Sequence, residues 1–369
     1  MAELDRLVGR KVGDRPGPSL IVVGGIHGNE PAGVRAAERV LSRLAGVPIR
    51  GELVAFAGNL RALRLGRRYQ ERDLNRQWSA RALLGTGKSQ DAEGLEQAEL
   101  RAALDDAVAR ARGPVAFIDL HTTSAEGIPF VMVGDTLRHR AFARAFPLPV
   151  ILGLEEQLDG VLTEYMTAKG CVTLACEGGQ HQSPDAAKNL EALLWLAVAA
   201  AGLAAPEALP GHAEAWAELD AARHGLPRVI EVLFRHPVAA GDDFVMEPGF
   251  ANIARVRSGQ RVARDRSGEL SAPSDGLVLL PLYQAQGADG FFFGRAVGPV
   301  AEEAAVWARR LGLDRLLPLM PGVEPRGDEL ALNPRAAGRY PMALFRLFGF
   351  RRAVPGAAGE LVLRRRVLG

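Results

Sequence analysis

The chain is poor in cysteine and lacks long hydrophobic runs. Cys171 and Cys176 are the only cysteines among its 369 residues. They lie five positions apart in one expected strand, where side chains alternate between the two faces, so we expect free, buried thiols and no disulfide. No apolar stretch reaches the about 18 residues of a membrane-spanning helix, and the N-terminus lacks the pattern of a signal peptide. We therefore expect a cytoplasmic protein without a membrane partner.

An excess of charge of one sign is missing as well. The chain has 45 Lys and Arg residues against 43 Asp and Glu residues, a formal net charge of +2. A protein without a strong basic field has no general attraction to nucleic acid or to an anionic membrane surface. The expected partner is therefore a small molecule and not nucleic acid. The composition leaves open whether the chain forms a homo-oligomer.

The first part of the chain alternates between two kinds of pattern. From residue 19 to about residue 203, short apolar runs such as "SLIVVGG", "GELVAFAGN" and "PVAFIDLHT" are separated by helical stretches. This alternation is typical of an α/β fold, in which ligands bind at the carboxyl ends of the strands. We predict a first domain over residues 1–225.

The pattern changes after a connection that is rich in proline and alanine. Short strands with glycine turns, such as "RVIEVLFRHPV" and "GFFFGRAVG", predict a second, smaller β-rich domain over residues 226–298. Residues 299–369 contain one amphipathic helix, "AEEAAVWARRLGLDRLL", and then an arginine-rich tail. We expect a helical, arginine-rich extension there, whose arginines form a solvated packing face and not an anion-binding surface.

Polar residues follow three of the expected strands. His27 and Glu30 come after the first strand, His121 follows "AFIDL", and Glu177 follows "VTLAC". A catalytic zinc ion takes three protein ligands from His, Asp and Glu and leaves a position for water, whose pKa falls to about 7. His27, Glu30 and His121 supply such a set, although a single loop histidine is more often a hydrogen-bonded structural residue.

A charged stretch, "RRYQERDLNRQW", lies between these candidate ligands. Its composition is also typical of a solvated turn. The adjacent Asn75 and Arg76, however, offer an amide and a guanidinium fork that together suit a substrate carboxylate. The residues alone leave both interpretations open.

Four motifs in this order and spacing, "GGIHGNE", "RYQERDLNR", "DLHTT" and "EGGQ", resemble those of the succinylglutamate desuccinylase and aspartoacylase family. This family is a branch of the zinc carboxypeptidase superfamily. The resemblance covers roughly residues 19–205, and a β-rich appended domain is also typical of the family. It implies an α/β fold with a zinc-carboxypeptidase-like mixed sheet flanked by helices.

The resemblance implies a role for each matching residue. His27 and Glu30 of "HGNE" and His121 of "DLHTT" would bind one zinc ion per chain. Glu177 of "EGGQ" would be the general base that takes a proton from the zinc-bound water and passes it to the leaving amine. Asp119 is a candidate partner of His121, because strand alternation places both on the same face.

Three further residues have substrate-binding roles by the same resemblance. Arg68 matches the arginine that polarises the scissile carbonyl and stabilises the oxyanion. Asn75 and Arg76 match the pair that holds a substrate carboxylate.

One departure from the family pattern concerns the substrate. Aspartoacylases bind a second substrate carboxylate with an arginine shortly before the catalytic glutamate, whereas no arginine occurs here between Arg144 and Arg223. Tyr165 and Lys169 are the nearest polar candidates for this role. The difference argues against N-acetylaspartate as the substrate.

Two other segments have a functional interpretation. "GTGKS", residues 85–89, suggests a phosphate-binding loop, but the complete pattern needs a glycine where Ala82 stands and a preceding strand. Tyr283 and "GFFFG" could line an apolar pocket, although core packing is the more common use of such aromatic residues. Neither segment changes the expected chemistry.

The sequence therefore predicts a zinc-dependent hydrolase, a deacylase that cleaves the amide bond of an N-acyl amino acid or a related small carboxylated amide. One alternative is a metallocarboxypeptidase that acts on peptides, which cleavage of unmodified peptides from the C-terminus would indicate. The other is a non-catalytic protein that binds a carboxylated metabolite, which zinc binding without turnover would indicate.

Overall fold

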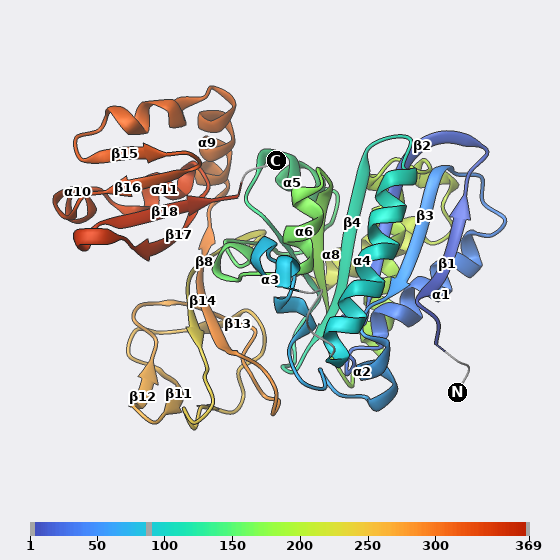
Figure 1. Ribbon diagram of the computed structural model, residues 1–369, viewed down its shortest axis with the longest axis horizontal. Coiled ribbons are helices and arrows are strands. Elements are labelled where there is room, and N and C mark those ends of the chain that lie inside the picture. The colour runs from blue at the N-terminus through green and yellow to red at the C-terminus, as the bar shows by residue number, and fades with distance from the viewer. Residues whose placement is uncertain (1–3, 86–90, 367–369) are drawn as a thin grey trace.

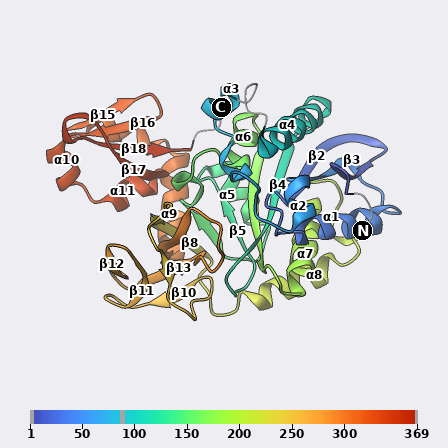
Figure 2. The ribbon, with the colours of Figure 1, turned by 60° about the horizontal axis from the view of Figure 1, so that its bottom comes forward.

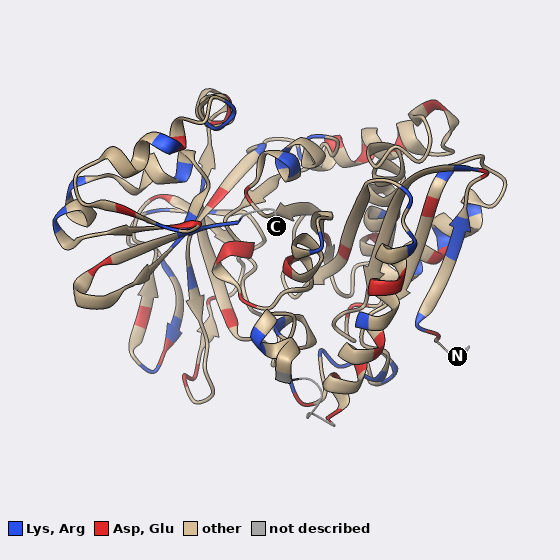
Figure 3. Ribbon diagram, turned by 45° about the horizontal axis from the view of Figure 1, so that its top comes forward, with Lys and Arg blue, Asp and Glu red and all other residues tan. Residues whose placement is uncertain are grey.

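The structure of the protein is a computed structural model that describes residues 4–85 and 91–366. Figure 1 shows three parts: a large sheet with helices around it, a β-rich part beside it, and a third part formed by residues after 298. Most of "GTGKS" falls on residues 86–90, so the phosphate-loop interpretation concerns residues outside those described. Acidic and basic positions are interspersed through all three parts (Figure 3).

The largest sheet within the described residues has eleven strands and is mixed, as predicted. Its strands in spatial order are β1 (Leu7–Val12), β3 (Arg50–Ala57), β2 (Arg15–Gly24), β4 (Val115–Thr123), β7 (Val172–Gln180), β5 (Phe130–Val133), β6 (Val150–Leu152), β8 (Val229–Pro237), β14 (Asp289–Val297), β13 (Gly276–Leu279) and β10 (Ala254–Val256). Strands β3, β2, β4 and β7 run parallel, whereas β1 and β5 pair antiparallel with β3 and β7. The sheet continues through β8 into the β-rich part.

Helices cover both faces of the central strands (Figure 2). One face carries α1 (Ala32–Leu44), α7 (Asp185–Ala200) and α8 (His212–Ala222), and the other carries α4 (Ala92–Arg110) and α6 (Leu162–Ala168). In β2, Leu20 packs in the core beneath α1, α7 and α8, whereas Ile21 packs in the core beneath α4 and α6. Because neighbouring residues are buried on opposite faces, such strands are apolar throughout. The shorter helices of this part are α2 (Leu60–Leu65), η1 (Leu74–Arg76), α3 (Ala80–Gly85), α5 (Leu137–Ala143), η2 (Glu155–Gln157) and η3 (Pro206–Ala208).

The β-rich part adds a small sheet to the far end of the large one. This three-stranded sheet consists of β9 (Val245–Met246), β11 (Arg261–Asp265) and β12 (Gly268–Ser271). Phe291 and Phe293 of β14 pack in the core beneath it, while Phe292 points to the opposite core. The three phenylalanines of "GFFFG" are therefore buried, and packing is their main role.

The last part contains a sheet that the sequence did not indicate. Its elements are α9 (Pro299–Arg310), η4 (Leu313–Leu319), β15 (Val323–Arg326), β16 (Glu329–Leu332), α10 (Pro334–Arg339), α11 (Met342–Leu347), β17 (Phe350–Pro355), η5 (Ala357–Gly359) and β18 (Leu361–Arg365). The strands are only four to six residues long, too short for a clear alternation of apolar and polar residues. The helix expected over residues 301–317 ends at Arg310, because Gly312 adopts a left-handed φ of 67°.

A buried carboxylate, that of Asp135, joins this last part to the first. It accepts hydrogen bonds from Arg140 at 2.6 Å, from Arg309 at 2.7 Å and from Arg351 at 2.6 Å. Burial alone would raise the pKa of Asp135, but the three arginines outweigh burial and hold this pKa well below its usual range. Arg351 also pairs with Glu231 of β8, so this arginine of the tail is buried between two acids and is not solvated.

Both cysteines agree with their prediction, since Cys171 and Cys176 are buried and free. Within the described ranges, no helix combines the length and the apolar character that are needed to cross a bilayer.

Replacing Asp135 tests the junction between the two parts. We expect Asp135→Asn to lower the free energy of unfolding by about 3 kcal/mol at pH 7, because buried arginines lose their anionic partner. Since the pKa of Asp135 is lowered in the folded state, its stabilisation is present above the unfolded pKa of about 3.9 and is lost as the pH falls through the folded value. Urea unfolding at a series of pH values should show a constant difference from wild type near neutrality that narrows below about pH 4.

The matched control is Asp159→Asn, which removes the exposed ion pair with Arg352 between the same two parts. Exposed pairs contribute less than about 1 kcal/mol, so this variant should unfold almost as wild type does. Equal effects of the two variants would contradict the special role of the buried carboxylate.

Candidate metal centre and active site

Three neighbouring strands bring the polar motifs to one edge of the sheet. Strands β2, β4 and β7 are parallel, so their carboxyl ends meet. His27 and Glu30 lie in the turn between β2 and α1. His121 of β4 and Glu177 of β7 stand directly opposite each other in the sheet register. Residues that are distant in the sequence therefore share one site.

The turn after β2 lies close against α2. A Cβ atom on Gly28 would come within 2.0 Å of the carbonyl carbon of Ala62, so only glycine fits at this position. The N–H of Gly28 also donates to the carbonyl oxygen of Arg68 at 3.1 Å. These contacts fix the turn that carries His27 and Glu30 against the segment that carries Arg68.

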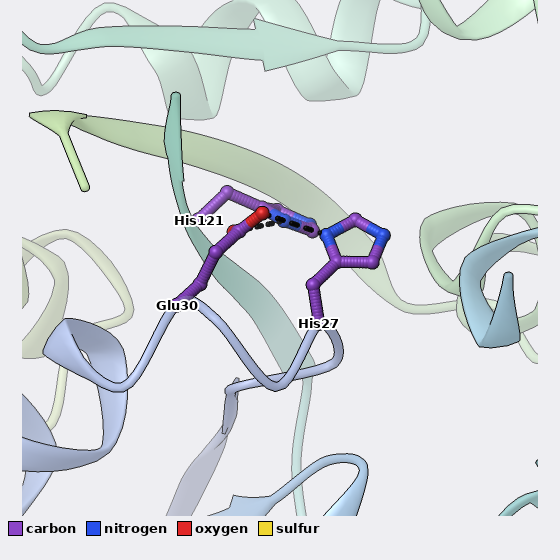
Figure 4. Close-up of side chains that lie close together, drawn as sticks. All are labelled: His27, Glu30 and His121. Atoms are coloured by element: carbon purple, nitrogen blue, oxygen red, sulfur yellow. Dashed lines mark hydrogen bonds and ion pairs between the residues drawn. The ribbon is translucent and has the colours of Figure 1, made fainter. Parts of the chain in front are cut away.

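The side chains of His27, Glu30 and His121 converge (Figure 4), and their ligand atoms all lie within 4.8 Å of one another. Nδ1 of His27 is 2.9 Å from Oε1 of Glu30, and Nδ1 of His121 is 3.1 Å from Oε2. Ligand bonds of about 2.0–2.2 Å to a tetrahedral ion place two ligand atoms about 3.4 Å apart, close to these separations. The three buried residues fit a divalent metal ion.

An aspartate contacts the other nitrogen of each imidazole ring. Nε2 of His27 is 3.2 Å from Asp73, and Nε2 of His121 is 3.0 Å from Asp119. Such carboxylate partners fix the tautomer and the orientation of a metal-binding histidine. Both Nδ1 atoms face Glu30 and are the candidate ligand atoms. The predicted partner Asp119 is therefore in contact with His121, whereas Asp73 has no role in the sequence-based prediction.

The carboxylate of Glu30 is held in its ionised form. Burial alone would raise its pKa, but His27 and His121 outweigh burial and hold the pKa well below its usual range. The backbone N–H of Thr122 donates to Oε2 at 3.0 Å. An ionised carboxylate is the form in which glutamate binds a metal.

Arg68 lies beside this group. Its Nη1 atom is 3.4 Å from Oε1 of Glu30, and its Nη2 atom donates to Asp73 at 3.1 Å. Asp73 therefore orients both His27 and Arg68. These two contacts hold the guanidinium of Arg68 at the edge of the cluster of His27, Glu30 and His121, which is called the metal group below.

Asn75 and Arg76 of η1 complete the polar side of the site. Oδ1 of Asn75 accepts the N–H of Leu162 at 2.8 Å, which leaves its amide N–H groups as donors. Arg76 donates to Asp289 of β14 at 2.6 Å, and Arg235 of β8 pairs with the same carboxylate. A residue of the β-rich part thus holds a predicted substrate-binding arginine.

Glu177 is a buried carboxyl group with an unused hydrogen-bond acceptor. Its exposed fraction is 6%, and its Oε2 atom has no hydrogen-bond partner in the part of the chain that the structure describes. Burial raises the pKa of Glu177 to about 8, against the opposing effect of His121. Such a group can exchange a proton near neutral pH.

All the predicted site residues line a single cavity, namely His27, Glu30, Arg68, Asn75, Arg76, His121 and Glu177. A loop of the β-rich part closes one side of it through Gln284, which accepts a hydrogen bond from Asn29 at 3.0 Å and lies 3.2 Å from Nε2 of His181. The β-rich part therefore contributes directly to the site.

The two polar candidates for a second carboxylate site lie elsewhere. Tyr165 and Lys169 do not line the cavity, and both contact Asp105 of α4, with a distance of 2.8 Å for Lys169. Neither replaces the missing arginine. Tyr283 is also absent from the cavity lining, whereas Phe292 is present.

Comparison with known proteins agrees with the four motifs. Residues 16–193 match the model of the succinylglutamate desuccinylase/aspartoacylase catalytic domain. A succinylglutamate desuccinylase of Burkholderia thailandensis is 29% identical over 67% of this chain and 70% of that protein. Another, from Burkholderia pseudomallei, is 31% identical over 43% of this chain and 47% of that protein.

Solved structures show the same fold. The crystal structure of a succinylglutamate desuccinylase/aspartoacylase from Rhodobacter sphaeroides superposes with a TM-score of 0.58 and 18% identity, over 79% of this chain and 88% of that one. The four motifs lie inside the matched residues, and the fold brings them into one cavity. Motif order and domain match therefore agree that residues 16–193 form a succinylglutamate desuccinylase/aspartoacylase catalytic domain.

Proposed function

We propose that this chain is a zinc-dependent deacylase that hydrolyses the amide bond of an N-acyl amino acid or a related small amide. The main support is the convergence of His27, Glu30 and His121 beside the buried carboxyl group of Glu177 in one cavity. The relatives are named for removing a succinyl group from succinylglutamate. The proposal carries over the type of reaction and not that substrate.

His27 and His121 would hold the ion through Nδ1, and Glu30 through its carboxylate. A zinc ion bound there would act as a Lewis acid and would lower the pKa of a bound water molecule to about 7. Two imidazole nitrogens and a carboxylate are donors that zinc accepts well. Asp73 and Asp119 orient the two rings, so the ligand set needs little rearrangement.

Glu177 is proposed to accept a proton from the attacking water and to donate it to the leaving amine. Proton transfer is most efficient when the pKa of the catalytic group is near the working pH. The raised pKa of Glu177 suits this role, and its free Oε2 atom has no competing hydrogen bond within the described chain. Its place opposite His121 brings it beside the metal group.

Arg68 is proposed to donate hydrogen bonds to the oxygen of the scissile carbonyl. Negative charge develops on this oxygen during attack, and one fixed donor often contributes about 3 kcal/mol to its stabilisation. The ion pair with Asp73 supports the proposal, because it holds the guanidinium in place before the substrate arrives.

Asn75 and Arg76 are proposed to bind the substrate carboxylate. The N–H of Leu162 occupies the oxygen of Asn75, and its Nδ2 atom lies 3.5 Å from Nε2 of His121, so one amide N–H remains to donate to a substrate carboxylate. A guanidinium has five N–H donors, so Arg76 can contact both Asp289 and a substrate carboxylate. The pair would fix the amino-acid end of the substrate.

Removal of one ligand tests the metal site. His121→Ala should weaken zinc binding by more than about a hundredfold, since even loss of a partner behind a ligand costs about 10- to 100-fold. Asp119→Asn should give a loss in that smaller range. Competition with a chromogenic chelator would measure both affinities, and elemental analysis of the dialysed wild-type protein should find about one zinc ion per chain.

His181→Ala is the control, because His181 lies near the cavity but outside the ligand group. Its zinc affinity should stay within a few-fold of wild type. Undiminished zinc binding by His121→Ala would remove His121 from the site.

Replacing the proposed base separates chemistry from metal binding. Glu177→Gln should bind zinc as wild type does and lower kcat for N-acyl amino acids by at least about a hundredfold, the usual effect of losing a general base. Steady-state kinetics on zinc-loaded protein would measure the change in kcat. Near-normal turnover by this variant would refute the mechanism.

The wild-type protein tests the alternative function. If it cleaves unmodified peptides and no N-acyl amino acid, the result would favour a carboxypeptidase.

A further inference from the structure

The cavity has a second side that the proposed chemistry does not use. Part of its wall is formed by apolar side chains of one buried core, namely Met132, Leu154, Leu158, Val161 and Phe292. A carboxylate-binding pocket would require donors at this place. The wall instead suits an aliphatic chain.

One carboxyl group interrupts this apolar wall. Glu155 of η2 lines the cavity and is only 4% exposed. Neither of its carboxylate oxygens has a hydrogen-bond partner of normal geometry among the described residues. Burial raises the pKa of Glu155 to about 7, although Arg366 and the hydroxyl of Thr163 favour the charged form. An unsatisfied buried carboxyl group is unfavourable unless a ligand supplies its partner.

The arginines near the cavity already have other partners. Arg68 contacts Glu30 and Asp73, and Arg76 contacts Asp289. Arg366 donates to the backbone carbonyl of Glu155 at 3.1 Å, and its other contact is Glu164 at 3.6 Å. Arg366 favours the charged form of Glu155 without a hydrogen bond to its carboxyl group, so both carboxylate oxygens remain available to a cation from outside the chain.

The charges of the residues that line the cavity also favour a cationic group on the ligand. Carboxyl groups outnumber arginines among the described residues that line the cavity. Even with a divalent ion bound, a second substrate carboxylate placed near Glu155 would meet a like charge in a poorly solvated part of the cavity, where like charges repel strongly. A substrate with one carboxylate and one cation would meet complementary charges at both ends.

We propose that the site selects N-acyl derivatives of basic amino acids, whose aliphatic stem lies on the apolar wall and whose terminal ammonium or guanidinium group pairs with Glu155. This inference rests on the proposed deacylase function and names its substrate class. Long basic side chains bury their methylene groups against apolar surface in just this manner, with the charged head at a polar group. Glu155 acts here as a specificity-determining residue and takes no part in the bond cleavage.

Binding to an inactive form of the protein tests the inference. Zinc-loaded Glu177→Gln protein is titrated by calorimetry with Nα-acetyl-lysine, Nα-acetyl-norleucine and Nα-acetylglutamate. The lysine derivative should bind at least about tenfold more tightly than the other two, because a charge-assisted hydrogen bond in a desolvated site commonly contributes a factor of ten or more. Equal or weaker binding of the lysine derivative would overturn the inference, and this comparison needs no change at Glu155.

A second substitution tests whether Glu155 causes the preference for the lysine derivative. Glu155→Gln, added to the same protein, should lose at least about tenfold in affinity for the lysine derivative and leave the norleucine derivative within about twofold. Glu156→Gln is the matched control, since the neighbouring Glu156 is equally buried but does not line the cavity and accepts the N–H of Asp135 at 2.8 Å. A loss of preference in the control, or its persistence in Glu155→Gln, would overturn the assignment.

Turnover distinguishes this inference from the proposed function. If wild type hydrolyses neutral or acidic N-acetyl amino acids faster than the lysine derivative, as judged by kcat/KM, the deacylase function stands and the substrate class is wrong. If the zinc-loaded protein hydrolyses none of them, the deacylase proposal fails. A preference for the lysine derivative in both binding and turnover supports both.

Discussion

The site depends on one buried carboxylate, that of Glu30. Each of its oxygens contacts a different histidine, and the backbone of β4 and the guanidinium of Arg68 supply further donors. An anion in the protein interior is stable only when its hydrogen-bonding capacity is satisfied. The same contacts join the turn after β2 to the end of β4. The positions of the candidate ligands and the junction of these two strands are therefore a single structural constraint.

The cavity around this carboxylate is assembled from parts that are far apart in the chain. The turn after β2 and the end of β4 provide His27, Glu30 and His121, the β-rich part provides Asp289 and Gln284, and η2 provides Glu155. A site with such contributions can keep its metal chemistry while changes in the surrounding loops alter the ligand.

The sequence predicted the parts whose signal is local. The apolar runs and the residues at their ends led to the α/β fold and to His27, Glu30, His121 and Glu177, because strand ends in such folds converge, whereas the mixed sheet was implied by the family resemblance. Asp289 and Glu155 escaped prediction because their meaning comes from partners or a cavity that only the fold brings near. Strand β1 and the last sheet escaped as well, because strands of four to six residues carry little periodicity.

The contact between Asp135 and Arg351 spans 216 residues, and this separation has a consequence during synthesis. At about 5–20 residues per second, Asp135 leaves the ribosome's catalytic centre on the order of 10 to 40 s before Arg351 is added. Until Arg309 is added, 174 residues after Asp135, the carboxylate has only its near neighbour Arg140 among the three arginines. The segment between β5 and α5, which holds Asp135, then lacks its contact with the last part of the chain. A nascent chain can therefore bring His27, Glu30 and His121 together before the wall of the cavity is complete.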